Sequence, residues 1–264
     1  MKALILAAGV GKRLKPITDR IPKTLIKIRE KPILGHILSS IKKCKIKDVL
    51  IVTGHLDNMI KDYVGSGSKW GLNVSYCYNK DYKKTENICS VKLAEKELLG
   101  NDFVMINADD LFPPTIISKI MRTPGHIVLA VDGEGTLGEE EMKVRVENGK
   151  VTSVTKNLDL SEAHGESIGI AKFSGEGSKT FFNMIDEIIQ DEGPKFYFEE
   201  AFDRLATQNY PISYINVKNE PWIEIDDHFD LKWAKTPISQ MILGRIKLVG
   251  RRIKSIRRKK QKKT

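Results

Sequence analysis

Two glycines and two cations follow the first apolar run of the chain. Residues 3–8 are apolar, Gly9 and Gly11 come next, and Arg13 and Lys23 stand a short distance further on. Glycines let backbone N–H groups approach a phosphate closely, and Arg and Lys side chains add positive charge at the same place. The segment therefore predicts a loop that binds a polyphosphate.

Two common nucleotide-binding motifs do not fit this loop. A Gly-x-Gly pair alone is a weak signal, because it also occurs in ordinary α/β loops. Leu14 stands where a dinucleotide fingerprint has its third glycine, and the loop lacks the Gly-Lys-Ser/Thr ending of a P-loop. The longer spacing of the motif must therefore carry the interpretation.

A second candidate position for chemistry is Asp109, which follows the apolar residues 103–106 after Asn107 and Ala108. In open α/β sheets, ligands collect outside the carboxyl ends of the strands. The competing structural interpretation is an Asp that caps the next helix, with Pro113 in its first turn.

Alternating strand and helix patterns would position these residues. The first part of the chain predicts strands at 2–7, 48–53, 73–78 and 103–107, with helices near 32–44, 56–64 and 86–99. The later part predicts a strand at 127–131, a hairpin over 143–154, helices near 178–190 and 198–207, and strands at 212–217 and 222–225. This order predicts an α/β fold: a three-layer α/β/α sandwich with a mostly parallel, Rossmann-like central sheet and a hairpin-containing second half.

Composition predicts a cytoplasmic protein. No apolar run approaches the roughly 18 to 20 residues of a membrane span, and no signal peptide is apparent. The three cysteines lack a Cys-x-x-Cys spacing, which argues against a disulfide framework or a structural zinc site.

The longer pattern Leu6-Ala7-Ala8-Gly9-x-Gly11-x-Arg13-Leu14-x-Pro16-x-Thr18-x-x-x-Pro22-Lys23 resembles the signature of the sugar-phosphate nucleotidyltransferase family. The resemblance implies an enzyme that joins a nucleoside triphosphate to a substrate phosphate and releases pyrophosphate. Arg13 would hold the β- and γ-phosphates, and Lys23 would bridge the nucleotide and the attacking phosphate. The nucleotide would also contact Leu6, Ala7, Ala8, Gly9 and Gly11.

The same resemblance implies a Mg²⁺ site. In the family the first acid after the strand holds the metal, and here that acid is Asp109. The late segment 222–227 resembles a second family motif, in which Glu224 and Asp226 lie two apart on a strand and so face the same side. Which of the two is the second ligand stays open, and two solvated acids at a strand edge are the structural alternative.

The segment 85–90 departs from the glycine-rich stretch of the sugar-type members. It looks closer to the Asn-x-x-Ser segment of the phosphocholine, phosphonate and inositol-phosphate cytidylyltransferases, so Asn87 and Ser90 would contact the nucleotide. We therefore favour CTP and a small polar alcohol phosphate or phosphonate over a hexose 1-phosphate. The segments that contain Glu166, Tyr197 and Glu199 also resemble that branch, so these residues would contact the acceptor. Lys156 matches the lysine that binds the acceptor phosphate in sugar-type members. A surface lysine and core aromatics are the structural alternatives.

Two other functions remain as alternatives. One is an enzyme of the same fold that makes a UDP-, dTDP- or GDP-sugar. The other is a noncatalytic relative that binds a nucleotide or sugar phosphate as a regulatory module. The presence of Arg13, Lys23, Asp109 and a late acid argues against the second alternative, since binding alone would not need the full set.

The net charge of +10 resides in the C-terminal tail, residues 237–264. Eleven Lys and Arg residues lie between Arg245 and Lys263, which leaves 33 basic against 34 acidic residues in the catalytic domain, residues 1–236. Apolar residues recur at three- and four-residue steps from Ile238 to Ile256, which predicts a basic amphipathic helix. We favour an anionic membrane surface, on the inner face of the membrane, as its partner. Packing on the body or in a homodimer is the main alternative, and nucleic acid is not favoured.

Overall fold

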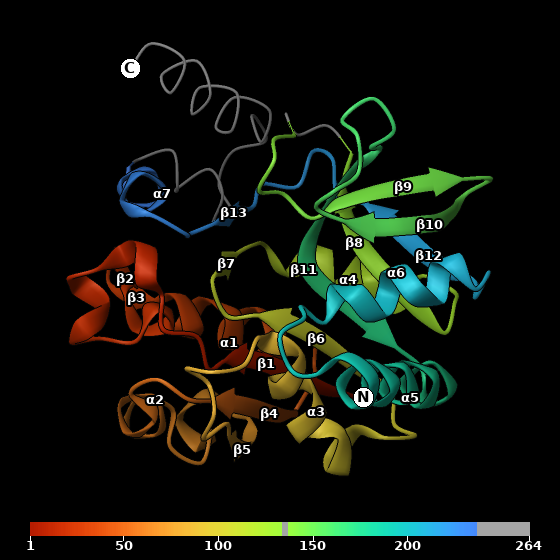
Figure 1. Cartoon of the computed structure of the whole chain (residues 1–264). Coiled ribbons are helices and arrows are strands. Elements are labelled where there is room, and N and C mark those ends of the chain that lie inside the picture. Colours follow the sequence, from red (N-terminus) through yellow and green to blue (C-terminus); the bar gives the residue numbers. More distant parts are fainter. Residues whose placement is uncertain (134–136, 237–264) are drawn as a thin grey trace.

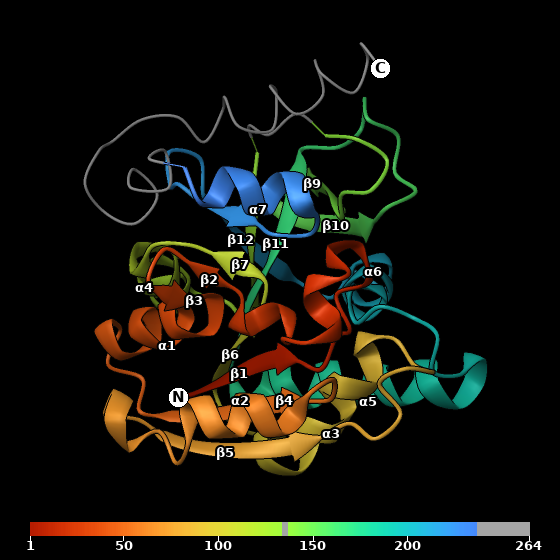
Figure 2. The ribbon, with the colours of Figure 1, turned by 90° about the vertical axis from the view of Figure 1, so that its left-hand side faces the viewer.

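The computed structural model describes residues 1–133 and 137–236, and its framework is one nine-stranded mixed sheet (Figure 1). The strand order is β5-β4-β1-β6-β11-β8-β12-β10-β9, so β5 and the β9-β10 hairpin form opposite edges (Figures 1 and 2). The strands are β1 (Lys2–Ala7), β4 (Asp48–Thr53), β5 (Asn73–Tyr78), β6 (Phe103–Asn107), β8 (Ile127–Asp132), β9 (Lys143–Glu147), β10 (Lys150–Thr155), β11 (Gly165–Phe173) and β12 (Ile212–Asn216).

The first four strands along the chain that enter this sheet, β1, β4, β5 and β6, are parallel to one another. Their carboxyl ends therefore open on the same edge, where the loop after β1 and the segment after β6 begin. Strands β1, β4 and β6 are mostly apolar, as expected for strands that are covered on both faces, whereas the edge strand β5 mixes polar and apolar residues. Successive side chains of β1 confirm this arrangement, because Leu4 packs in one hydrophobic core and Ile5 in another.

The described residues form seven α-helices: α1 (Ile33–Lys43), α2 (Asp57–Val64), α3 (Asn87–Leu98), α4 (Pro114–Arg122), α5 (Gly175–Glu192), α6 (Glu199–Thr207) and α7 (His228–Ala234). Helix α7 contacts the short strand β13 (Ile223–Glu224), which lies outside the main sheet. Buried residues of α1, α2, α4 and α7 join the core that contains Ile5. Those of α3, α5 and α6 join the core that contains Leu4. Both hydrophobic faces of the sheet are thereby removed from water.

Two short ribbons lie outside the main sheet. One pairs β2 (Lys27–Ile28) with β3 (Lys31–Pro32), and the other pairs β7 (Asp110–Leu111) with β13 (Ile223–Glu224). The second ribbon joins segments that are more than a hundred residues apart in the sequence. It is the element that builds the acidic part of the candidate site.

The predicted α/β fold with a central sheet and a hairpin is confirmed, but the prediction of a mostly parallel sheet is wrong. The pairings of β1 with β4 and β6, of β4 with β5 and of β8 with β12 are parallel, whereas those of β9, β10 and β11 with their neighbours are antiparallel. The nine-residue strand β11 was not predicted, and it lies antiparallel between β6 and β8. Gly169 lies inside this strand and has φ +70° where the pairing with β8 shifts register. A bulge of this kind obscures the alternating pattern from which a strand is predicted.

The predicted boundary at residue 236 stays a prediction, and the tail of residues 237–264 lies outside the described residues. Among the described helices, none is long and apolar enough to cross a membrane.

Candidate active site

The loop after β1 is compact because it folds into three short 3₁₀ turns, at Lys12–Leu14, Ile17–Asp19 and Lys23–Leu25. Gly11 has φ +66°, and a Cβ at this position would lie 3.0 Å from Thr18 Cγ2 and 3.1 Å from Lys23 Cβ. The Thr18 hydroxyl donates to the Gly11 carbonyl over 2.8 Å. Only glycine fits this close approach without displacing the loop. The turn therefore sets where Lys23 enters the site.

A pocket at the carboxyl ends of β1 and β6 gathers five of the residues predicted from the sequence. It is lined by Leu6, Ala7, Gly9, Pro22, Lys23, Thr24, Ala108 and Asp109. Ala8 is buried beside it, and its carbonyl accepts a hydrogen bond from the His55 backbone N–H over 3.1 Å. Several residues that would contact the nucleotide therefore line the same pocket as Asp109, a candidate metal ligand.

The β7-β13 ribbon brings the predicted acids together. Glu224 pairs with Asp110 in the ribbon, and the Ile225 N–H donates to the Asp109 carbonyl over 3.1 Å. One carboxylate oxygen each from Asp109, Glu224 and Asp226 lies within 4.8 Å of the others. Distance therefore does not decide whether Glu224 or Asp226 is the second metal ligand, because an oxygen of each lies close to Asp109.

Both predicted cations contact this acidic group. The Lys23 ammonium lies 2.7 Å from Asp109 Oδ2 and 2.7 Å from Asp226 Oδ1. The Arg13 guanidinium lies 2.7 Å from the other oxygen of Asp226. The side chains of Lys23 and Asp226 are only 14% and 16% exposed, whereas that of Arg13 is 56% exposed. The network is therefore mostly shielded from water, except on the Arg13 side.

The charges hold one another in their ionised forms. Burial disfavours the charged form of Lys23, but the carboxylates of Asp109, Asp226 and Glu224 outweigh it and raise the pKa of that lysine. Burial likewise acts to raise the pKa of Asp226, but Lys23 and Arg13 hold it below its usual value. In contrast, burial and the neighbouring carboxylates of Asp109 and Glu224 raise the pKa of Asp110 well above its usual value.

This donor set fits a hard divalent cation. Carboxylate oxygens are the ligands that Mg²⁺ prefers, together with phosphate oxygens and water. Asp109 Oδ1 is buried and has no hydrogen-bond partner, which is costly for a carboxylate oxygen unless a ligand satisfies it. The three acids could therefore hold Mg²⁺.

A second group of predicted residues lies around the start of α6. Asn87, the first residue of α3, accepts a hydrogen bond from the Phe198 N–H over 2.8 Å and also hydrogen-bonds Glu199. The Lys156 ammonium lies 5.1 Å from the centre of the Tyr197 ring. Tyr197 is exposed, whereas Glu199 is buried and its Oε2 atom has no hydrogen-bond partner.

Burial is the main cause that raises the pKa of Glu199 to about 7, against opposing effects of its own backbone N–H, Asn87 and Lys156. The charge of Asp109 acts on Glu199 as well, in the raising direction. Asp109 of the first group therefore acts on Glu199 of the second through its charge.

Two of the predicted site residues, Ser90 and Glu166, are buried and contact other parts of the protein. Ser90 is buried in α3, and its hydroxyl accepts a hydrogen bond from the Asn79 side chain over 3.1 Å. Glu166 is buried on β11, where it pairs with Asp132 of β8 and Lys143 of β9. Their predicted contacts with nucleotide and acceptor stay predictions.

Helix α7 supports the site and was missed by the sequence reading. Asp227 and Asp230 form a capping box at its N-terminus, and Asp230 Oδ2 also accepts from the Asp226 N–H over 3.0 Å. His228 hydrogen-bonds the Lys15 carbonyl, which ties this helix to the loop after β1. The spacing Asp227-x-x-Asp230 was the available signal, since an acid followed three residues later by a second acid is similar to a capping box.

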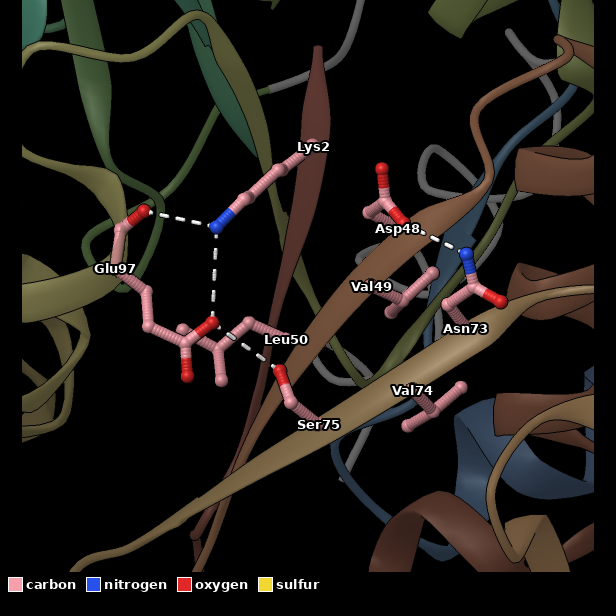
Figure 3. Close-up of a pocket in the computed structure, with 8 residues that line it drawn as sticks. All are labelled: Lys2, Asp48, Val49, Leu50, Asn73, Val74, Ser75 and Glu97. Atoms are coloured by element: carbon pink, nitrogen blue, oxygen red, sulfur yellow. Dashed lines mark hydrogen bonds and ion pairs between the residues drawn. The ribbon is translucent and has the colours of Figure 1, made fainter.

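A further pocket lies at the opposite end of the parallel strands (Figure 3). There the Lys2 ammonium donates to the Glu97 carbonyl over 3.1 Å, and the Ser75 hydroxyl donates to Glu97 Oε2 over 3.3 Å. Its lining comes from the first residues of β1, β4 and β5 and from Glu97 of α3. It contains none of the residues that the sequence motifs single out.

Comparison with known proteins places the chain among relatives of one chemical class. It is 33% identical to CMP-5'-(3-aminopropyl)phosphonate synthase of Streptomyces rubellomurinus, over 89% of this chain and 38% of that protein. It is 24% identical to CTP:phosphoglutamine cytidylyltransferase of Campylobacter jejuni, over 88% of this chain and 98% of that protein. It is 40% identical to glucose-1-phosphate thymidylyltransferase of Streptomyces griseus, over 66% of this chain and 49% of that protein.

A solved structure supports the fold. The structure of CTP:phosphocholine cytidylyltransferase from Streptococcus pneumoniae superimposes with a TM-score of 0.70 at 22% identity, over 89% of this chain and 97% of that one. The nucleotidyl transferase family matches residues 2–124, which contain the glycine loop, Lys23 and Asp109. These residues therefore belong to the nucleotidyl transferase family, which confirms the family predicted from the motif, and the relatives described above are named for enzymes of that class.

Proposed function

We propose that the protein transfers a cytidylyl group from CTP to a small polar alcohol phosphate or a phosphonate and releases pyrophosphate. The observation that carries the proposal is the meeting of Arg13 and Lys23 with Asp109, Glu224 and Asp226 beside the glycine loop. A polyphosphate substrate needs cations and a divalent metal at one point, and this arrangement brings two cations together with carboxylates that would hold the metal.

In the proposed reaction an oxygen of the acceptor phosphate or phosphonate attacks the α-phosphorus of the nucleotide. A new P–O bond forms, the bond from the α-phosphorus to the oxygen that bridges it to the β-phosphorus breaks, and pyrophosphate leaves with that bond's electron pair. No general base is needed, because the attacking group is already an anion near neutral pH. The protein then contributes mainly positioning and charge stabilisation.

The chain's own residues have distinct parts in this proposal. Arg13 is the more exposed cation, and it would meet the β- and γ-phosphates, where the nucleotide enters the pocket. Lys23 lies deeper, next to Asp109, and would contact the reacting phosphate. Asp109, Glu224 and Asp226 would hold Mg²⁺, which supplies charge to the phosphate oxygens when bound.

The second group of residues, around the start of α6, is proposed to bind the acceptor. Lys156 and Tyr197 present a cation and an exposed aromatic face, and Glu199 is a buried acid whose pKa is raised to about 7, mainly by burial. A polar head group of modest size suits such a mixture of groups better than an apolar one. The exposed ring of Tyr197 already carries the Lys156 ammonium, so a cationic acceptor would have to displace it.

The preference for CTP rests on sequence. The segment that contains Asn87 and Ser90 resembles the cytidylyltransferase branch, and two of the relatives described above are named for CMP or CTP. A sugar nucleotidyltransferase is the second candidate, because a thymidylyltransferase is 40% identical over 185 residues. The noncatalytic alternative is disfavoured by the complete set of cations and acids in contact.

The test is a substrate panel with the full chain. The protein is incubated with Mg²⁺, one of CTP, UTP, GTP, ATP or dTTP, and a pool of phosphomonoesters and phosphonates. Pyrophosphate is measured, and products are identified by mass. We expect the fastest release with CTP and a polar alcohol phosphate or phosphonate. Turnover with glucose 1-phosphate and dTTP or UTP, and none with CTP, would establish the second candidate instead.

A further inference from the structure

We infer that in the nucleotide-free protein the Lys23 ammonium holds the place of the divalent cation, so that metal and nucleotide bind cooperatively. The inference rests on the proposed function, since it concerns the same carboxylates. It adds a second part for Lys23, as an internal counter-ion that must be withdrawn before the metal is bound.

The geometry gives the two cations one binding place. Lys23 Nζ lies 2.7 Å from an oxygen of Asp109 and 2.7 Å from an oxygen of Asp226, and both acids belong to the group that could hold a metal. A metal bound at about 2.1 Å from one of these oxygens would lie within about 5 Å of the ammonium. In a shielded site, two cations at this separation repel strongly. The carboxylates therefore favour one of them at a time.

The nucleotide is the group that can draw Lys23 away. Lys23 also lines the pocket beside Gly9, where the polyphosphate would lie, so it need only turn toward a phosphate. Arg13 contacts Asp226 on its exposed side and can be attracted by the same phosphates. When these cations pair with phosphate, the carboxylates lose their counter-ions and attract the metal. By linkage, the bound metal must then strengthen nucleotide binding by the same factor.

The experiment measures Mn²⁺ binding to the full chain by the loss of the free-ion electron paramagnetic resonance signal. Wild type, Lys23→Met and the matched control Lys12→Met are titrated without nucleotide. Lys12 is an exposed lysine of the same loop. We expect Lys23→Met to bind Mn²⁺ on the order of tenfold more tightly than wild type, because a unit charge beside the metal is removed. Lys12→Met should match wild type.

The titrations are repeated with a CTP analogue that has a methylene bridge between the α- and β-phosphorus atoms, with Mn²⁺ binding to the free analogue subtracted. The analogue should raise the Mn²⁺ affinity of wild type, and raise that of Lys23→Met by a smaller factor. Equal or weaker Mn²⁺ binding by Lys23→Met without nucleotide would overturn the inference, provided its circular dichroism spectrum and melting temperature match those of wild type.

The double variant Asp109→Asn, Lys23→Met separates this inference from the proposed function. It should lose the Mn²⁺ binding gained by Lys23→Met. If Asp109→Asn abolishes Mn²⁺ binding while Lys23→Met equals wild type, the metal site stands and the placeholder role fails. If Asp109→Asn leaves Mn²⁺ binding unchanged both in the wild-type chain and in Lys23→Met, the three acids do not form the metal site, and the inference fails as well.

Discussion

Three basic residues of the loop after β1 differ in what surrounds them. Arg13 and Lys23 contact carboxylates of the candidate site, whereas Lys12 is exposed. We expect Arg13→Ala and Lys23→Ala each to lower kcat/KM at least about 100-fold, because charge-assisted contacts made in a dry transition state are typically worth several kcal/mol. Lys12→Ala should cost roughly threefold at most. The measurement is steady-state pyrophosphate release, and similar losses in all three variants would mean that the loop acts only through its total charge.

Asp109 carries the prediction for the metal. Asp109→Asn keeps the size of the side chain but removes its negative charge from the group formed with Glu224 and Asp226. We expect activity to be abolished, because the carboxylate charge that would bind the metal is lost. The melting temperature should stay close to that of wild type, because the amide fills the same space. Comparing Glu224→Gln with Asp226→Asn then ranks the other two ligands. An active Asp109→Asn enzyme with unchanged Mg²⁺ dependence would exclude the site.

Glu199 should make stability depend on pH. Its pKa rises from the usual 4.5 to about 7 in the folded chain, mainly through burial. Between these pH values the folded state binds more protons at this group than the unfolded state, so the contribution of Glu199 to stability falls as pH rises. Glu199→Gln has no such loss, and its free energy of unfolding relative to wild type should increase from pH 4.5 to pH 7 by as much as about 3 kcal/mol. Urea denaturation at several pH values checks this, and a constant difference would contradict it.

At the residue scale, the sequence predicted the cations and the acids but not their pairing. Arg13, Lys23 and Asp109 stand in motifs of fixed spacing, so their identity could be read directly. The contact of Lys23 with Asp226 spans 203 positions and depends on the path of the ribbon between them. The burial of Glu199 and of its unpartnered oxygen is likewise a property of packing, which no local pattern encodes.

Elements with a clean hydrophobic period were predicted closely, and those without one were missed. Strands β1, β4 and β5 have the predicted bounds. β1 and β4 are mostly buried apolar runs, whereas in β5 the apolar Val74 and Tyr76 alternate with the polar Asn73 and Ser75. In β11, Gly169 lies so close to Asn107 that a Cβ would come within 2.4 Å of its amide nitrogen. The register of β11 shifts at this glycine, which lies against Asn107. Because tertiary packing imposes the irregularity, the glycine is the only sign of it in the local sequence.

The short helix α7 allows a test at the scale of an element. The Asp227 carboxylate accepts from the N–H groups of Phe229 and Asp230 over 2.8 and 2.9 Å. Asp227→Ala should lower the free energy of unfolding by about 1 kcal/mol, the usual value of an N-cap. It should also lower kcat/KM by roughly tenfold, because Asp226 is anchored through the same turn.

The conservative variant Asp227→Ser keeps a capping oxygen and should restore most of both losses. Chemical denaturation and pyrophosphate release measure the two effects separately. If Asp227→Ala loses stability but retains full activity, then α7 supports the fold without positioning Asp226.

At the scale of the whole molecule, charge is divided unequally along the chain. Residues 1–244 contain 33 basic and 34 acidic residues, whereas the eleven basic residues beyond them are accompanied by no acid. The balanced part holds the site, in which cations and carboxylates neutralise one another. A surplus confined to one end of the chain is not needed for the proposed chemistry, so the sequence predicts a separate role for residues 237–264.

We propose that this interaction is with an anionic membrane, because the apolar residues from Ile238 to Ile256 recur at helical spacing among the cations. An activated polar head group is a substrate for membrane-embedded transferases, which gives such a location a use. Removing residues 237–264 should abolish sedimentation with anionic liposomes at moderate salt and leave kcat/KM in solution within about twofold of the full chain, since the site residues named above all precede residue 237. Neutral liposomes serve as the control and should sediment neither form. Equal sedimentation of the two forms, or failure of the truncated protein to fold, would instead favour packing of the tail on the body or in a homodimer.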